Sequence, residues 1–290
     1  MDQEKKENID KILDKIKALP TLSIVVAKVI QIVSNPLTSA SDLSKLITLD
    51  QALTAKVLRL ANSAFYGFPF RIKNITQAVS ILGFDTIRNL ALTVSVYKVF
   101  TGSDRDATEF SHQEFWKHSV GVMIAANILA KKIKYKSVEG AFTAGLLHDI
   151  GKNFFDQYMH NEFMEAIKYA KEKRISITEG EKHIIGIDHA EVGMMMAEKW
   201  NLPPELRAGI AHHHKPDEEK DEPVMAQIIN VANILCKQQH IGFAGDDILE
   251  PISKEARLLL NLDAAAEEEV IKQMENELKE AEAFFAIPGA

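Results

Sequence analysis

The stretch Leu146-Leu147-His148-Asp149-Ile150-Gly151-Lys152 places a histidine and an aspartate side by side within an apolar, helix-like sequence. Buried apolar sequence gains nothing from an imidazole beside a carboxylate unless the two groups hold each other, a metal or a ligand. We therefore expect this pair in the core of a helical bundle, in one of these three roles. A buried, hydrogen-bonded pair without a metal is the simplest of them, and it stays open at this point.

The other histidines are confined to one part of the chain. All ten lie between His112 and His240, and the sequence before His112 contains none. The segment from Gly102 to Thr108 is polar and has no large apolar residue, which is typical of a domain boundary. We predict a helical N-terminal lobe over residues 1–104 and a second helical lobe, with the C-terminal helices, over residues 105–290.

Apolar residues recur with the period of a helix along nearly the whole chain, and strand signals are almost absent. One continuous helix is expected over residues 154–173. Thr178 and Glu181 have the spacing of a capping box, which predicts the start of the next helix. The predicted fold is therefore all-α, with two packed helical bundles.

Composition limits the classes of function. The chain has 290 residues, 46% hydrophobic and 26% charged residues, a net charge of -7 and a single cysteine, Cys236. No apolar run approaches the roughly 20 residues that cross a bilayer, and the first residues lack the apolar core of a signal peptide. We expect a cytoplasmic protein with no membrane contact.

Nucleic-acid binding is an unfavoured alternative. Residues 41–63 have the rhythm of a helix-turn-helix and carry Lys45, Lys56 and Arg59. Two short helices are more often plain bundle elements, and the negative net charge opposes binding to a phosphate backbone.

Several imidazoles could join Asp149 in one metal site, since His118, His189 and residues 212–214 all belong to predicted helices or helix ends. Imidazole and carboxylate ligands suit iron, manganese, zinc or nickel. Adjacent residues on a helix diverge by about 100°, so His148 and Asp149 need a helix end or two metals to act together. A bound metal could generate a hydroxide for attack on a phosphodiester, with Lys152 beside the phosphate. His118 could equally be a core histidine bonded to a backbone carbonyl, and Lys152 a partner for a helix-terminal carboxylate.

Four segments in order carry a family resemblance: Leu19-Pro20-Thr21-Leu22, then residues 47–63, Phe65-Tyr66-Gly67, and residues 75–83. With the His-Asp pair, the chain from Leu19 to Pro216 resembles the HDOD family, the HD-related output domains of signalling proteins in the HD superfamily. This resemblance implies an all-α regulatory domain whose second lobe is an HD-like bundle. Such domains are often coupled to receiver, sensor or cyclic-dinucleotide modules, usually without demonstrated catalysis.

The resemblance also implies a set of metal ligands. His118, His148 and Asp149 match the first three positions of the superfamily's metal pattern. His189 matches an extra ligand position of the HD-GYP phosphodiesterases, and the paired histidines there correspond to His213 and His214, or to His212 and His213 in another register. Two departures stand out: Asn233 replaces the superfamily's last aspartate, and the Gly-Tyr-Pro segment is missing. An amide binds metal more weakly than a carboxylate, so Asn233 would be a weakened ligand and hydrolysis is in doubt.

Two functions remain in competition. The favoured one is a signal-transduction output domain that binds a divalent transition metal and acts through a signalling protein partner, without catalysis. Iron is the first expectation, with manganese, zinc or nickel as alternatives, and no residues for an organic cofactor are expected. The alternative is a metal-dependent phosphohydrolase acting on a cyclic dinucleotide or nucleotide, in which Lys152 would be catalytic.

Overall fold

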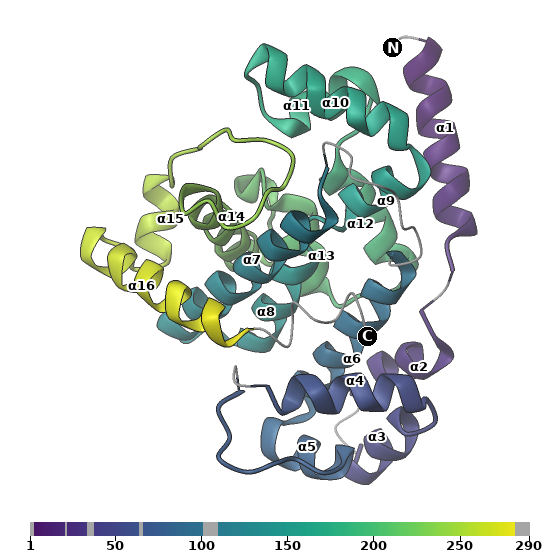
Figure 1. Cartoon of the computed structure of the whole chain (residues 1–290), viewed down its shortest axis with the longest axis vertical. Coiled ribbons are helices and arrows are strands. Elements are labelled where there is room, and N and C mark those ends of the chain that lie inside the picture. The colour runs from purple at the N-terminus through teal and green to yellow at the C-terminus, as the bar shows by residue number, and fades with distance from the viewer. Residues whose placement is uncertain (1–2, 21, 34–37, 64–65, 101–109, 282–290) are drawn as a thin grey trace. The chain divides into compact units, whose positions relative to one another are not determined.

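The computed structural model describes residues 3–20, 22–33, 38–63, 66–100 and 110–281 of the chain. Within these ranges the regular elements are helices and there is no strand (Figure 1). The prediction of an all-α fold is confirmed.

The chain divides into two compact units. Unit 1 combines Met1–Leu19 with Ser103–Met274, and unit 2 combines Pro20–Gly102 with Glu275–Ala290. The predicted boundary at residue 104 falls outside the described residues, so the division into lobes 1–104 and 105–290 stays a prediction.

Unit 2 is a bundle of short helices with α6 packed against α2, α4 and α5. Its helices are α2 (Ile24–Val33), α3 (Ala40–Ile47), α4 (Gln51–Ala61), α5 (Ile75–Leu82) and α6 (Phe84–Phe100). Ser39 begins α3 with a complete capping box, and the Asp50 carboxylate caps α4 by accepting a hydrogen bond from the Leu53 N–H. Leu43 and Val57 are fully buried, so the segment with the helix-turn-helix rhythm buries apolar residues of both its helices within this bundle.

Unit 1 carries the histidines, and its longest helix, α7, is buried from His118 to Ala130. Helices α8 and α14 pack on α7, and α13 contacts both of them. The helices of unit 1 are α1 (Gln3–Ala18), α7 (His112–Lys132), α8 (Val138–Leu147), α9 (Ile150–Tyr158), α10 (His160–Lys173), α11 (Ile177–Ile184), α12 (His189–Lys199), α13 (Pro204–His212), η2 (Pro216–Glu218), α14 (Pro223–Gln238), α15 (Lys254–Leu259) and α16 (Ala264–Glu280), the last of which belongs to this unit up to Met274.

Two local predictions for unit 1 are wrong. The single helix expected over residues 154–173 is broken at Met159, whose backbone leaves the helical region (φ -137°, ψ 38°) and whose side chain is buried. The capping box before α11 is formed by Ser176 and Glu179, not by Thr178 and Glu181. The Glu181 side chain is thereby free to turn into the core, where its exposure is 0%.

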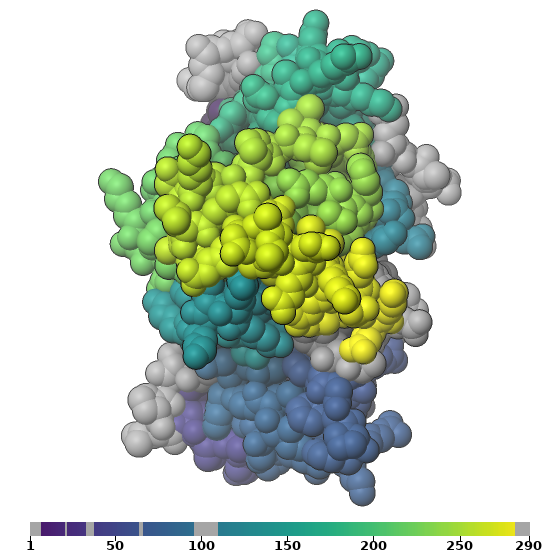
Figure 2. All heavy atoms as spheres, turned by 90° about the vertical axis from the view of Figure 1, so that its left-hand side faces the viewer, coloured from purple at the N-terminus to yellow at the C-terminus, as the bar shows by residue number. Residues whose placement is uncertain are grey.

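The last helices of unit 1 lie at its surface, where α15 and the start of α16 form part of the face seen in Figure 2. Leu258 on α15 is 80% exposed. Among the described residues, none of the helices has both the length and the apolar character that crossing a bilayer requires.

Candidate metal centre

The His-Asp pair lies at a break between two helices. His148 is the C-terminal cap of α8, and Asp149 is the N-terminal cap of α9 with a non-helical backbone (φ -95°, ψ 16°). Because the helix is interrupted here, two adjacent side chains can turn toward one centre, which a continuous helix would prevent. The break also brings α9 very close to α12, since a Cβ atom on Gly151 would lie 2.0 Å from the carbonyl oxygen of His189.

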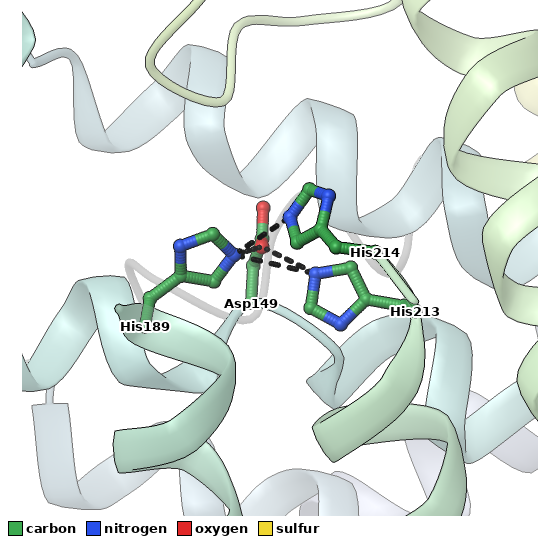
Figure 3. Close-up of side chains that lie close together, drawn as sticks. All are labelled: Asp149, His189, His213 and His214. Atoms are coloured by element: carbon green, nitrogen blue, oxygen red, sulfur yellow. Dashed lines mark hydrogen bonds and ion pairs between the residues drawn. The ribbon is translucent and has the colours of Figure 1, made fainter. Parts of the chain in front are cut away.

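Three imidazoles from other helices converge on the Asp149 carboxylate (Figure 3). His189 is the first residue of α12, which begins with a capping box formed by Asp188 and Glu191. Its Nε2 atom lies 3.0 Å from Asp149 Oδ1 and 3.3 Å from His213 Nε2. His214 comes from the same α13 terminus as His213, and its Nε2 lies 3.1 Å from His189 Nε2. These four residues have ligand atoms within 4.8 Å of one another, the spacing of a metal site.

His118 and His148 form a second cluster with the same aspartate. Their ligand atoms and one oxygen of Asp149 again lie within 4.8 Å of one another. His148 Nε2 is 3.3 Å from Asp149 Oδ2, and the rings of His118 and His148 are 5.5 Å apart between centroids. Asp149 therefore faces one cluster with Oδ1 and the other with Oδ2.

The register of the triple histidine is resolved by the geometry. His213 Nε2 is 3.5 Å from Asp149 Oδ1, whereas His212 points to Glu219, with 3.3 Å between His212 Nε2 and the carboxylate. His213 and His214 thus join the cluster and His212 does not.

Four of the imidazoles are oriented by their Nδ1 atoms. Nδ1 lies 2.7 Å from Gly145 O in His148, 2.8 Å from Ile210 O in His213 and 3.3 Å from Ile241 O in His118. In His189 the acceptor is the Glu181 carboxylate, at 2.7 Å. A ring whose Nδ1 carries the hydrogen keeps a lone pair on Nε2, and Nε2 is the atom that each ring presents to its cluster.

Burial sets the charge state of these rings. It lowers the pKa of His118 to about 3 and that of His213 to about 4, so both are neutral at pH 7 and able to bind a cation. His189 differs: burial lowers its pKa, but the Glu181 and Asp149 carboxylates outweigh burial and raise the pKa to about 9. Without a metal this ring therefore also holds a hydrogen on Nε2 at pH 7, which a metal ion would displace. Burial raises the pKa of Asp149, but His148 and Lys152 oppose this and hold it well below its ordinary value.

The cluster contains polar atoms that a metal would satisfy. Among the described residues, His118 Nε2, His148 Nε2 and Asp149 Oδ1 are buried and make no hydrogen bond, although Asp149 Oδ1 lies within ion-pair distance of His189 Nε2. A buried polar atom without a partner costs about 1–3 kcal/mol. The lone pairs, the carboxylate and the spacing all fit a transition metal.

Lys152 and Asn233 occupy the surroundings of this cluster. Lys152 lies one turn after Asp149 and donates a hydrogen bond of 2.7 Å to Asp149 Oδ2, with both side chains buried. Asn233 is buried on α14, and its Oδ1 atom has no hydrogen-bond partner among the described residues.

Sequence reasoning missed two supporting residues. Glu181 holds both the Nδ1 and the backbone N–H of His189, at 2.7 and 2.9 Å. Asn230 donates a hydrogen bond of 2.8 Å from Nδ2 to the His213 carbonyl. Its position one helical turn before Asn233 was the only signal that could have drawn attention to it.

A cleft of about 400 Å³ reaches the cluster at His214. Its lining holds four carboxylates, those of Asp188, Glu191, Glu198 and Glu218, against Lys182 and Lys215. Both lysines are already paired, Lys182 with Asp188 at 2.8 Å and Lys215 with Glu218 at 3.2 Å. The cleft is therefore acidic.

Most of the chain matches the model of a known protein family. The family model for the HDOD domain matches residues 19–216, more than half of the 290 residues.

Curated relatives match parts of the chain. An uncharacterized protein of Treponema pallidum (strain Nichols) is 26% identical over 228 residues, which are 78% of this chain and 44% of that protein. Ribonuclease Y of Thermus thermophilus is 29% identical over 123 residues, 42% of this chain and 16% of the enzyme. The chain thus spans less than half the length of the relatives that it matches.

Several solved structures share the fold. An HDOD domain protein of unknown function from Geobacter sulfurreducens superposes with a TM-score of 0.78 at 22% identity, covering 98% of each chain. A candidate signal transduction protein from Marinobacter aquaeolei VT8 has a TM-score of 0.77 at 22% identity, covering 99% of this chain and 66% of its own. A candidate phosphohydrolase from Shewanella amazonensis SB2B has a TM-score of 0.70 at 24% identity, covering 96% and 97%. At these identities the likeness is one of fold.

Proposed function

The chain belongs to the HDOD family, and on that basis we propose that it is a cytoplasmic signalling output domain that binds a divalent transition metal and acts through contacts with a partner protein. The observation that carries the metal is the convergence of five imidazoles on the Asp149 carboxylate.

The metal would be held by residues from four parts of unit 1. His189, His213, His214 and Asp149 would form one site, and His118 and His148 would share Asp149 in the other. Iron is the first candidate, with manganese, zinc or nickel as alternatives. A metal at this position would link α7, the α8–α9 junction, α12 and the end of α13, and so would stabilise this bundle.

Two observations support a role without catalysis. Asn233 stands where the resemblance places the last aspartate of the HD superfamily, and an amide supplies no negative charge to the metal. The cleft at His214 is acidic, so it repels an anionic substrate such as a cyclic dinucleotide.

A metal-dependent phosphohydrolase is the second candidate, and specific observations favour it. The two clusters share a carboxylate, and a bound metal pair would supply Lewis acidity and a hydroxide nucleophile. Lys152 lies against that carboxylate, where its ammonium could neutralise a phosphate oxygen of a cyclic dinucleotide or nucleotide.

Metal binding is tested by elemental analysis of protein purified without added metal. We expect a transition metal in the wild type and a lower metal content in His213→Gln. His212→Gln is the matched control, because His212 adjoins His213 but faces Glu219, and it should retain the metal. A wild type without metal, or equal metal content in the two variants, would contradict the site.

Catalysis is tested by supplying iron, manganese, zinc or nickel with a panel of cyclic dinucleotides and nucleotides. The output role predicts no product. Hydrolysis that disappears in both His148→Ala and Asp149→Ala would replace our first proposal by the second.

A further inference from the structure

A second pocket in unit 1 lies away from the metal centre. It has a volume of about 500 Å³ and lies between the C-terminal end of α10 and the loop that follows α14. Figures 1 and 2 both show this loop beside α10 and α11. None of the proposed metal ligands is among the described residues that line it.

The interior of the pocket is apolar. Ile167 and Ala170 of α10 supply one wall, and Phe243 and Ile248 of the loop supply the other. Ile167 and Ala170 are buried, whereas Phe243 and Ile248 are partly exposed and so present apolar surface to the pocket. Pockets of roughly 300–1,000 Å³ with apolar walls and a few polar groups are typical of small-molecule sites.

The rim of the pocket carries two cations. Lys171 and Arg174 line the pocket and are exposed, and no ion pair is found for either among the described residues. Arg174 ends α10 in the left-handed conformation (φ 54°), and its N–H donates to the Lys171 carbonyl. This turn keeps the guanidinium and the ammonium at the same end of α10.

The carboxylate deepest in the pocket wall is already neutralised. Asp246 accepts hydrogen bonds from Lys237 and from the backbone N–H groups of Ile177 and Ile248, the latter two at 2.8 and 2.9 Å. The exposed Asp247 is the other acidic residue of the lining. The lining therefore has two cations and only one carboxylate that is not already neutralised, so the pocket favours an anionic ligand.

The loop that forms this wall is held in place by hydrogen bonds and packing. Besides the Asp246 contacts, the Phe243 N–H donates to the Glu114 carbonyl at 3.1 Å. Gly245 has a φ of 111°, which other residues rarely adopt, and it packs against the Ile177 side chain. A preformed pocket of this kind binds without first ordering the loop.

We propose that this pocket binds a small organic acid, with an aromatic or branched apolar body between the two walls and its anionic group between Lys171 and Arg174. Guanidinium groups bind carboxylates with paired, charge-assisted hydrogen bonds, which gives Arg174 the larger part in recognition. The proposal does not depend on the metal or on the proposed function.

The test uses the full chain, with the same metal content throughout, and two probes of equal shape. 2-Naphthoate carries the anionic group, and 2-naphthamide lacks its charge. Titration followed by naphthalene fluorescence should give an affinity for the acid about tenfold higher than for the amide. Equal affinities, or no binding of the acid at millimolar concentration, would overturn the proposal.

Reversing the charges of the two rim residues tests whether the probe binds in this pocket. Lys171→Glu with Arg174→Glu should weaken 2-naphthoate binding about tenfold or more, and both residues are exposed, so the fold should survive. Lys173→Glu is the matched control, since Lys173 lies on the same exposed turn but does not line the pocket, and it should bind as the wild type. Phe243→Ala should weaken acid and amide alike. An unchanged affinity in the double variant would place the probe elsewhere and contradict the proposal.

Discussion

The carboxylate of Glu181 lies 2.7 Å from Nδ1 of His189, and both side chains are fully buried. The same oxygen accepts the His189 backbone N–H at 2.9 Å. One carboxylate therefore fixes the ring, its tautomer and the first residue of α12, and leaves Nε2 directed at Asp149. Carboxylates in this position next to a metal-binding histidine orient the ring and raise its basicity.

Replacing Glu181 by Gln should weaken metal binding by about 10–100-fold, because the amide lacks the charge that raises the basicity of His189. Competition with a chromophoric chelator measures this affinity. Glu172→Gln, at an exposed position of α10, is the control and should leave it unchanged. An unaltered affinity in Glu181→Gln would show that this carboxylate does not support a metal ligand.

Replacing Gly151 by Ala should disrupt the centre, since the new Cβ atom would lie 2.0 Å from the His189 carbonyl oxygen, a backbone atom that cannot rotate away. We expect a loss of about 1–3 kcal/mol in the free energy of unfolding and a lower metal content. Gly193→Ala is the comparison, because its Cβ would meet a side-chain methyl group, Cγ2 of Ile210, at 2.8 Å and not a backbone atom at 2.0 Å. Urea unfolding with elemental analysis should therefore show the larger effect for Gly151→Ala.

Replacing Asn233 by Asp should strengthen metal binding, since it returns the carboxylate that the family resemblance places there and adds a charge in a buried position. Any trace of phosphodiester hydrolysis should rise with it. Asn230→Asp should act in the opposite direction, because it removes the Nδ2 donor to the His213 carbonyl. Chelator competition on both variants checks the pair, and a weaker affinity in Asn233→Asp would contradict a ligand position at residue 233.

The Asp246 carboxylate should stabilise unit 1 in a pH-dependent manner. Burial raises its pKa, but Lys237 outweighs burial and leaves the pKa below its ordinary value. A carboxyl group whose pKa is lower in the folded state contributes stability above its unfolded pKa of about 3.9, and loses this contribution as the pH falls through the folded value. Asp246→Asn should thus cost about 1–3 kcal/mol at pH 7, and the difference from wild type should shrink below about pH 4. Urea unfolding across this range measures it, with the exposed Asp247→Asn as control; a difference that grows on acidification would reverse the sign.

The sequence predicts which histidines belong to the site, but not the residues that orient them. A His-Asp pair in apolar sequence and a run of histidines after a helix are visible because imidazoles are rarely buried without a purpose. Glu181 is not visible in this way, since one carboxylate in a charged helix becomes a partner of His189 only when α11 and α12 come together. A capping box with Thr178 would turn the Glu181 side chain toward the start of the helix. Because α11 instead begins at Ile177, with Ser176 and Glu179 as its capping pair, the Glu181 side chain turns into the core.

The helix break at Met159 has no local signal either. Neither Gly nor Pro stands there, and the weak helix formers Tyr158, His160 and Asn161 do not by themselves end a helix. The Met159 side chain is 3% exposed, so tertiary packing ends α9 where local preference would continue it.

The two clusters share the single negative charge of the Asp149 carboxylate. Its Oδ1 lies 3.0 Å from His189 Nε2 and its Oδ2 lies 3.3 Å from His148 Nε2. Two cations held there would repel each other across a single carboxylate, so the second would bind less tightly than the first. Metal uptake would then proceed in two unequal steps, with the protein half-loaded over a range of concentrations, and loss of the Asp149 side chain would empty both positions at once.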